Sequence, residues 1–311
     1  MKSLLRPSIL LTAAILILLP FVLPNAYIID VAIRIGLSAI VAIGLNLLMG
    51  FAGQISIGHA AFVALGAYAT GIATVTFGWP PVLALCIGAV GVAILAYIIA
   101  KPILRLKGLS LAMATLGLGI IVNIVLINEV RWTGGPDGMA VGPLQVGDWV
   151  LQGETAWYTL VAVLLFIALI ISLNLFSSPA GRALRALHSS EVAASVMGVD
   201  VASFKVRVFV LSAVFASIAG SLTAHYSSFI TPGLSGFMPS VELATMVVVG
   251  GMASTFGAIF GAFLIVALPQ IFGGIQGYEM VFFGLILMLT MIFLPKGIIP
   301  TLAHYFRRAR N

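Results

Sequence analysis

The sequence predicts an all-α fold, a polytopic bundle of transmembrane helices, and two features of its composition support this class. Hydrophobic residues make up 61% of the 311 residues and charged residues only 8%, whereas a soluble domain carries about 25% charged residues. The apolar residues extend from one end of the chain to the other and leave no polar stretch long enough for a soluble domain. We therefore treat residues 1–311 as a single transmembrane domain.

Ten apolar runs are candidates for membrane spans, because a helix needs about 20 mostly apolar residues to cross the hydrocarbon core. They lie at residues 8–23, 31–49, 54–77, 80–100, 109–128, 156–176, 206–228, 240–253, 255–272 and 278–294. The eighth and ninth runs are short, so they either cross the membrane or form a re-entrant hairpin. We expect about ten helices, eight at the fewest, with broken or re-entrant segments.

The basic residues predict the orientation of the bundle. All of the 15 lysines and arginines except Arg34 and Arg131 lie in segments that ten spans place on one side, together with both termini. Lysine and arginine are enriched in cytoplasmic segments, so both termini are predicted to be cytoplasmic. The net charge of +6 then follows from topology, and no nucleic-acid partner is expected.

The first apolar run, which follows Lys2 and Arg6, also resembles the start of a secretory signal peptide. No A-x-A cleavage site follows it. We therefore count this run as a transmembrane helix.

Glycines gather in two segments, residues 44–58 and residues 250–261. Glycine lets helix backbones approach closely in lipid, and tight packing explains any single glycine. Broken helices, however, also line the paths of transporters. The first segment carries polar side chains too, and such side chains in a membrane usually face the bundle interior or a cavity.

We expect part of this polar set to line a translocation path. Its members are Asn46, Gln54, Ser56 and His59. Thr115, Glu242 and Thr245 are weaker candidates, and Glu242 has the alternative of lying at the outer interface.

Other titratable residues have simpler explanations. Asp30 and Arg34 are four residues apart near the predicted outer start of a helix, which favours a local ion pair that anchors the helix. Cys86 is the only cysteine, so no internal disulfide is possible. His225 and His304 have no partner at metal-ligand spacing, and no metal site is expected.

Residues 177–207 are the longest polar stretch on the predicted cytoplasmic side. Ser190 is a suitable N-cap for a short helix over residues 191–197, and Gly198 suits the left-handed position that ends it. Asp200 can then cap the next membrane helix. Such a helix either acts as a lever for a partner protein or simply connects two spans.

Residues 129–155 form the longest external segment, and the Pro136-Asp137-Gly138 sequence within it favours a tight turn. Loops of this length usually do more than connect two elements. Contact with an external partner through Trp132 and Asp137 and a structured cap over the helix ends remain equal alternatives.

The chain has no motif for an enzyme. It contains no G-x-x-x-x-G-K-[ST] sequence for binding ATP phosphates, no H-E-x-x-H sequence and no plausible nucleophile–base pair. It also has no intramembrane series of acidic residues or histidines for a proton relay. We expect no cofactor. An ion-coupled carrier is disfavoured, although sodium coupling through backbone carbonyls stays open.

Several segments, in order along nearly the whole chain, resemble motifs of branched-chain amino-acid ABC transporter permeases of the LivM type. They are residues 44–62, 105–116, 133–138, 181–187, 191–198 and 293–297. Two details depart from the usual pattern. Leu109-Ser110 stands where an aromatic residue often follows the glycine, and Glu191 lies one residue further from Gly198 than in the general importer motif.

The resemblance implies a bacterial inner-membrane permease that pairs with a second homologous permease, two cytoplasmic ATP-binding subunits that hydrolyse ATP, and a periplasmic solute-binding protein. It implies import of leucine, isoleucine and valine, with urea, short amides or other small organic solutes as the alternative cargo. The residues implied in coupling to the ATPase are Arg182, Arg185, Glu191, Ala193, Ala194 and Gly198.

Overall fold

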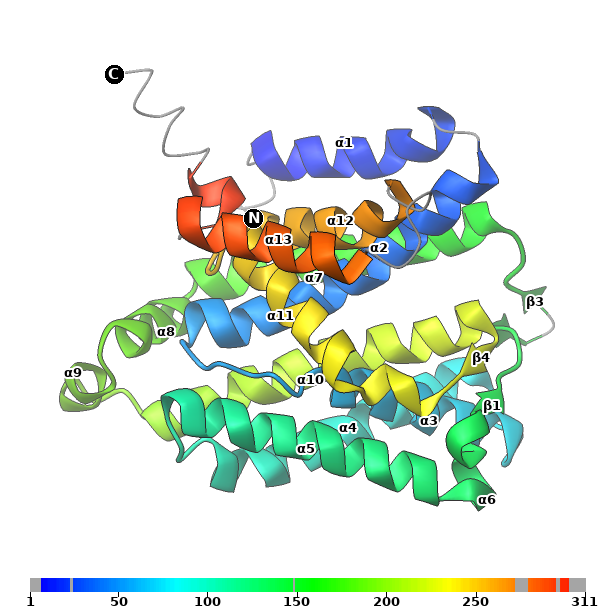
Figure 1. The fold of residues 1–311 in the computed structure, drawn as a ribbon, viewed down its shortest axis with the longest axis horizontal. Coiled ribbons are helices and arrows are strands. Elements are labelled where there is room, and N and C mark those ends of the chain that lie inside the picture. The colour runs from blue at the N-terminus through cyan, green and yellow to red at the C-terminus, as the bar shows by residue number, and fades with distance from the viewer. Residues whose placement is uncertain (1–6, 23–24, 148, 272–278, 295–296, 302–311) are drawn as a thin grey trace.

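The computed structural model describes residues 7–22, 25–147, 149–271, 279–294 and 297–301. Each of the ten predicted apolar runs contains a helix. These helices are α1 (Pro7–Val22), α2 (Ala26–Asn46), α3 (Ala60–Val75), α4 (Pro81–Ile103), α5 (Gly108–Asn128), α7 (Glu154–Ser177), α10 (Val201–Ser227), α11 (Phe237–Gly250), α12 (Thr255–Ile271) and α13 (Glu279–Phe293). The predicted helical bundle is confirmed (Figure 1).

Shorter elements connect these helices at the two ends of the bundle. They are the π-helical turn η1 (Leu47–Phe51), α6 (Val130–Thr133), the 3-10 turn η2 (Gly135–Asp137), α8 (Pro179–Ser189), α9 (Glu191–Val196) and the 3-10 turn η3 (Pro232–Ser235). The strands are β1 (Met139–Ala140), β2 (Gln145–Val146), β3 (Trp149–Val150) and β4 (Phe229–Ile230). Helices α8 and α9 lie at one end and the strands at the other, and we call these the α9 end and the strand end (Figure 1).

Within the described residues, five helices are long and apolar enough to cross a membrane: α2 with its η1 extension, α4, α5, α7 and α10. Helices α3, α11 and α12 are apolar but shorter, and α11 and α12 follow one another through a turn at residues 251–254. Three predicted boundaries were wrong. Helix α2 begins at Ala26 and α10 at Val201, five residues before the predicted starts, and residues 54–59 precede α3 rather than belonging to it.

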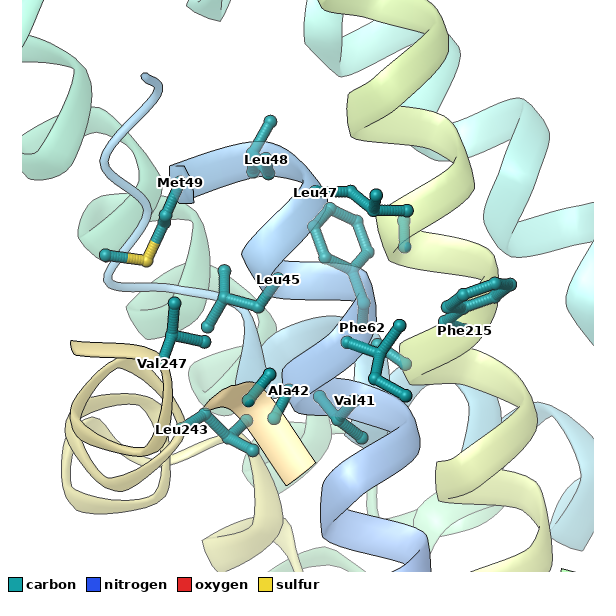
Figure 2. Packing of buried hydrophobic residues seen from close by; sticks show 14 of the residues in the cluster. Val41, Ala42, Leu45, Leu47, Leu48, Met49, Phe62, Phe215, Leu243 and Val247 are labelled. Atoms are coloured by element: carbon teal, nitrogen blue, oxygen red, sulfur yellow. The ribbon is translucent and has the colours of Figure 1, made fainter. Parts of the chain in front are cut away.

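Helix α10 lies at the centre of the bundle and packs against α2, α3 and α4. On one side of α2, α12 and α7 complete the packing. The core joins side chains from α2, η1, α3, α10 and α11 (Figure 2). At the contact of α3 with α10, a Cβ on Gly66 would lie 2.2 Å from the Ser217 carbonyl oxygen, so this approach requires glycine.

The strand end ties the long connection after α5 to the end of α10. Strand β1 pairs antiparallel with β4, with Met139 opposite Ile230. Strands β2 and β3 form a separate hairpin. His225 Nδ1 of α10 lies 2.7 Å from the Gly142 carbonyl oxygen. The described part of the predicted external segment therefore forms a cap over the helix ends.

Candidate translocation path and coupling region

A break interrupts the chain between α2 and α3. Helix α2 widens into the π-helical turn η1, and the chain then runs without helical structure through residues 52–59. Two side chains from other helices bind the freed backbone: Thr115 Oγ1 accepts a hydrogen bond from Ile57 N at 3.1 Å, and Ser240 Oγ accepts one from Ala60 N at 3.3 Å. Non-helical backbone at membrane depth needs such shielding.

The break is in backbone contact with α5. A Cβ on Gly58 would lie 1.7 Å from the Thr115 carbonyl oxygen, so no other residue fits there without displacing α5. A Cβ on Gly119 would lie 3.5 Å from Gly58 Cα. Movement of α5 would therefore move the break directly.

Four of the predicted path residues leave buried polar atoms unpaired among the described residues: Asn46, through its Nδ2 atom, and three residues within the break itself. Gln54, Ser56 and His59 are almost fully buried. Among the described residues, both amide atoms of Gln54, Ser56 Oγ and His59 Nδ1 have no hydrogen-bond partner. The other ring nitrogen of His59 lies 2.9 Å from Ser212 Oγ. Because an unpaired buried polar group costs about 1–3 kcal/mol, these atoms are suited to binding water or a polar solute.

A cavity of about 230 Å³ lies beside the break, between α5 and the start of α11. It is lined by Ile57, Leu116, Gly119, Ile120, Asn123, Ser235, Gly236, Phe237 and Ser240. As far as the described residues go, the lining is mostly apolar and has no charged side chain. Asn123 Nδ2 donates to the Pro232 carbonyl oxygen at 2.8 Å and to Ser235 Oγ at 3.0 Å, which holds η3 against α5.

The predicted path residues make separate contacts and do not gather at this cavity. None of them is among its lining residues, although Ser56 and Thr115 are sequence neighbours of Ile57 and Leu116. Asn46 instead accepts a hydrogen bond from Ala253 N at 2.9 Å. Glu242 is exposed on α11, and Thr245 donates to the carbonyl oxygen of Val241 in its own helix. Sequence reasoning missed Asn123 and Ser235, although a lone amide inside an apolar run was an available signal.

The predicted short helix at the other candidate site is confirmed. Ser190 Oγ accepts a hydrogen bond from Ala193 N at 3.2 Å and begins α9. Gly198 has a φ of 82°, the left-handed conformation expected of it. Asp200 Oδ1 accepts from Ser203 N at 3.1 Å and caps α10. The local sequence alone therefore specifies this connection.

Glu191 joins α9 to two membrane helices. Its carboxylate lies 3.0 Å from Lys107 Nζ, just before α5, and also pairs with the buried Lys205 of α10. Partial burial raises the pKa of Glu191, but the hydrogen bonds and charges of the two lysines outweigh it, so the pKa falls below its ordinary value. The unusual position of Glu191 in the motif thus coincides with a structural role.

A chain of aromatic contacts connects α8 to the break. Arg185 Nη1 donates to the Phe176 carbonyl oxygen at 3.0 Å, and its guanidinium lies 4.4 Å from the Phe176 ring centroid. The Phe176 ring lies 4.8 Å from that of Phe51, the last residue of η1. His188 of α8 also lies against Gly53 of the break. A movement of α8 would therefore be transmitted to the break through these contacts.

Helix α9 presents apolar side chains away from the protein. Val196 and Met197 are 83% and 80% exposed, and Val192 is exposed as well. Of the predicted coupling residues, Arg182 and Ala193 are exposed, whereas Ala194 is buried. Exposed apolar side chains on a short helix at the end of the bundle are typical of a docking surface. Sequence reasoning missed these three residues.

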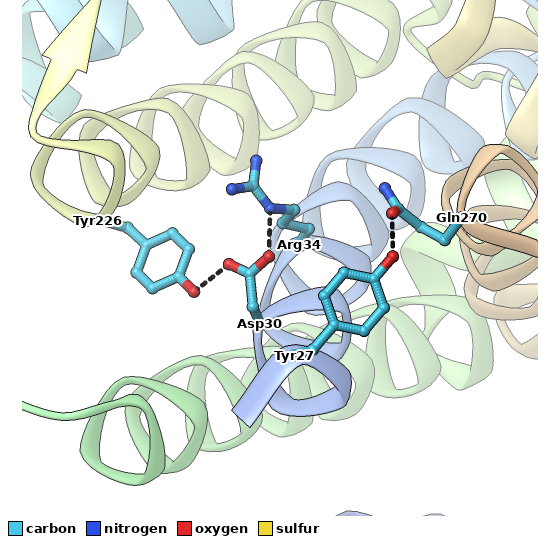
Figure 3. A network of polar contacts seen from close by, with 5 residues as sticks. All are labelled: Tyr27, Asp30, Arg34, Tyr226 and Gln270. Atoms are coloured by element: carbon cyan, nitrogen blue, oxygen red, sulfur yellow. Dashed lines mark hydrogen bonds and ion pairs between the residues drawn. The ribbon is translucent and has the colours of Figure 1, made fainter. Parts of the chain in front are cut away.

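At the strand end, Trp132 stacks on Phe77, with ring centroids 5.8 Å apart, and it remains partly exposed. Asp137 is exposed in η2. The predicted Asp30–Arg34 ion pair is present, with Arg34 Nε 3.0 Å from Asp30 Oδ2. The Tyr226 hydroxyl donates to the other Asp30 oxygen, and Figure 3 shows this network beside the hydrogen bond from Tyr27 to Gln270.

Comparison with known proteins agrees with these features. Residues 27–294 match the family model described as "Branched-chain amino acid transport system / permease component". The chain is 31% identical to the high-affinity branched-chain amino acid transport system permease protein LivM of Escherichia coli (strain K12), covering 88% of this chain and 70% of that protein.

More distant relatives have the same kind of name. The chain is 28% identical to LivH of Escherichia coli (strain K12), over 84% of this chain and 90% of the relative, and 26% identical to BraD of Pseudomonas aeruginosa, over 84% and 91%. No solved structure matches the chain. The apolar helices, the extent of the family match and these relatives together establish that the chain is a multi-pass membrane protein of the branched-chain amino acid transport permease family.

Proposed function

We propose that this chain forms half of the membrane channel of an ATP-driven importer for leucine, isoleucine and valine. A second homologous permease would form the other half. Two cytoplasmic ATP-binding subunits would hydrolyse ATP, and a periplasmic binding protein would deliver the solute. The α9 end would then face the cytoplasm of a bacterial inner membrane, as the distribution of lysine and arginine predicts.

The observation that carries this proposal is the contact chain from α9 to the break. The exposed Val196 and Met197 offer a docking point for an ATPase subunit. Force applied there would pass through α8, Phe176 and Phe51 to η1, and through Glu191 to α5. The second route ends at α5, which lines the 230 Å³ cavity, and the first ends where the break begins, six residues before the lining residue Ile57. The same movement would then open or close the solute path.

Docking can be tested by placing a charge on α9. In the complex coexpressed with its partner subunits, Val196→Glu should prevent copurification of the ATPase subunits, because a carboxylate disrupts an apolar contact. The matched control is Val130→Glu, which changes another exposed valine, at the strand end. The Val130→Glu complex should still copurify with its ATPase subunits. An intact complex with normal leucine uptake in Val196→Glu would contradict the proposed lever.

Coupling can be tested without removing the docking surface. Ala194 is buried and Gly198 has a positive φ, so Ala194→Leu and Gly198→Val should distort α9. Neither substitution removes the apolar side chain of Val196. In proteoliposomes that contain the whole assembly, we expect ATP hydrolysis to continue while leucine uptake falls. Normal uptake per ATP hydrolysed in both variants would contradict a lever at this position.

The cargo is tested by comparing leucine with urea and acetamide in the same proteoliposomes. The cavity lining offers little chemical selection, so the binding protein would set specificity. Uptake of urea or acetamide but not leucine would show that the proposed substrate is wrong.

The exposed Trp132 and Asp137 would lie on the side that the binding protein approaches. Solute uptake by the purified chain without ATPase subunits would instead favour an ion-coupled carrier.

A further inference from the structure

Arg34 lies within the candidate membrane span that α2 forms with η1, just before the longest uncharged stretch of that span. It follows the first residue of the helix by eight positions, which is about 12 Å along the axis. A charged side chain at such a depth usually faces a water-filled cavity, a partner or the bundle interior. The Arg34 side chain is nevertheless 52% exposed, so this chain does not enclose it. The aqueous path and another subunit are then the surroundings that suit it.

The orientation of the guanidinium is fixed by its neighbours. Arg34 Nε donates to Asp30 Oδ2, and the Tyr226 hydroxyl donates to Asp30 Oδ1. Arg34 Cζ lies 6.0 Å from the Tyr226 ring centroid, and Trp157 packs against that ring at 5.3 Å. Both oxygens of Asp30 are therefore engaged, and the arginine is held at one edge only.

The other edge of the guanidinium is available to a ligand. Within the described residues, neither Nη atom of Arg34 donates a hydrogen bond, and Figure 3 shows both pointing away from Asp30. A planar guanidinium with free N–H groups matches a carboxylate, which it binds through two parallel hydrogen bonds. The described residues that line the cavity beside the break carry no charge and cannot supply this contact.

The geometry points to Arg34 as the residue that binds the α-carboxylate of an amino acid as it enters the path from the external side. This inference rests on the proposed function and names the part of the solute that the permease itself recognises. Asp30 lowers the net charge around Arg34, so the carboxylate would be held weakly enough to move on, as conduction requires. The apolar cavity, which is lined by elements other than α2, would receive the aliphatic side chain of the same solute at a later point of the path.

The first test measures uptake of radiolabelled leucine and ATP hydrolysis in parallel, in proteoliposomes with the whole assembly and its binding protein. Arg34→Gln should reduce leucine uptake per ATP hydrolysed by about tenfold or more, the size of a lost charge-assisted hydrogen bond. Arg34→Lys should recover part of the loss, since lysine keeps the positive charge but lacks the paired N–H donors of the planar guanidinium. The matched control, Lys101→Gln, removes an exposed charge at the α9 end and should leave uptake unchanged.

The second test separates carboxylate binding from a structural role. Sodium isovalerate has the carboxylate and branched chain of leucine, and isovaleramide has the same chain without the charge. At a concentration that leaves leucine on the binding protein, isovalerate should inhibit uptake by the wild type more than isovaleramide does. The difference should disappear in Arg34→Gln. Equal preference for isovalerate in both proteins would overturn the inference.

Two further outcomes distinguish this inference from the proposed function. If Arg34→Gln loses the second permease during purification, Arg34 is a subunit contact and the carboxylate role is wrong. If the wild type accumulates a different carboxylate instead of leucine and Arg34→Gln does not, the proposed substrate is wrong while the role of Arg34 stands.

Discussion

The turn between α11 and α12 and the break between α2 and α3 are both places where glycine backbones meet a neighbouring segment. Around the turn, a Cβ on Gly250 would lie 1.9 Å from the Gly257 carbonyl oxygen, and one on Gly261 would lie 1.8 Å from that of Met246. The polar group of the turn is used locally, since Ser254 Oγ accepts a hydrogen bond from Gly257 N at 3.0 Å.

The break has equally close glycine contacts but a different polar state. Gly58 touches α5 as closely as Gly261 touches α11. Unlike Ser254, however, Gln54 and Ser56 have no hydrogen-bond partner among the described residues. Glycine therefore indicates close packing in both places, and only the unpaired polar groups indicate a place where a solute or water binds.

The largest expected effect is a loss of stability at the contact of α12 with α11, beside the turn. Gly261→Leu would place a side chain against the backbone of α11, where no flexible atom can give way. Overpacking costs about 1–3 kcal/mol and more against rigid backbone. We expect the purified complex to lose its folded permease, measured by size-exclusion chromatography and thermal unfolding in detergent.

The matched control for this substitution is Gly91→Ala in α4, where an added Cβ meets no atom within 4 Å. Alanine favours a helix over glycine by about 1 kcal/mol, so this variant should be as stable as the wild type or more so. A stable, active Gly261→Leu protein would show that the turn is not a packing contact and would remove the distinction between the two segments.

Asn46 offers an intermediate test, because its side chain connects the two segments. Its Oδ1 atom accepts the hydrogen bond from Ala253 N, and Ala253 has a positive φ of 61° despite its Cβ. Asn46→Ala would leave that part-buried N–H without its acceptor, and a fully buried group left so costs about 1–3 kcal/mol. We expect a lower unfolding temperature in detergent.

Thr223→Ala is the control, since among the described residues Thr223 Oγ1 bonds only to the Ala219 carbonyl oxygen of its own helix. Its effect on stability should stay within about 0.5 kcal/mol. If Asn46→Ala were no less stable than Thr223→Ala, the two segments would be independent of each other.

Much of this fold follows from local sequence patterns. The helices were predicted because apolar runs of sufficient length have few other structures in a membrane. The caps at Ser190 and Asp200 were predicted because a cap depends on residues within one turn. The existence of α9 needed no information from the rest of the chain.

The remaining features depend on contacts between distant segments. The start of α3 was placed six residues too early because Thr115 and Ser240, far away in sequence, bind the backbone that leaves the helix. The cavity was missed for the same reason, since its lining comes from three separate elements. The polarity of Gln54 and Ser56 was visible in the sequence, but their lack of partners was not.

The smallest expected effect on stability separates packing from function most sharply. Gln54→Met keeps a similar volume and removes two unpaired buried polar atoms, so the unfolding temperature should stay the same or rise. If Gln54 binds the moving solute or its water, leucine uptake should still fall, by up to about tenfold for one lost hydrogen bond. Ser217→Ala is the matched control, because Ser217 Oγ is also buried and has no partner in the described part of the chain, but it lies in the contact of α3 with α10. It should leave uptake unchanged. Wild-type uptake by both variants would mean that the unpaired atoms of the break are a packing defect, and the break would then be a packing contact like the turn.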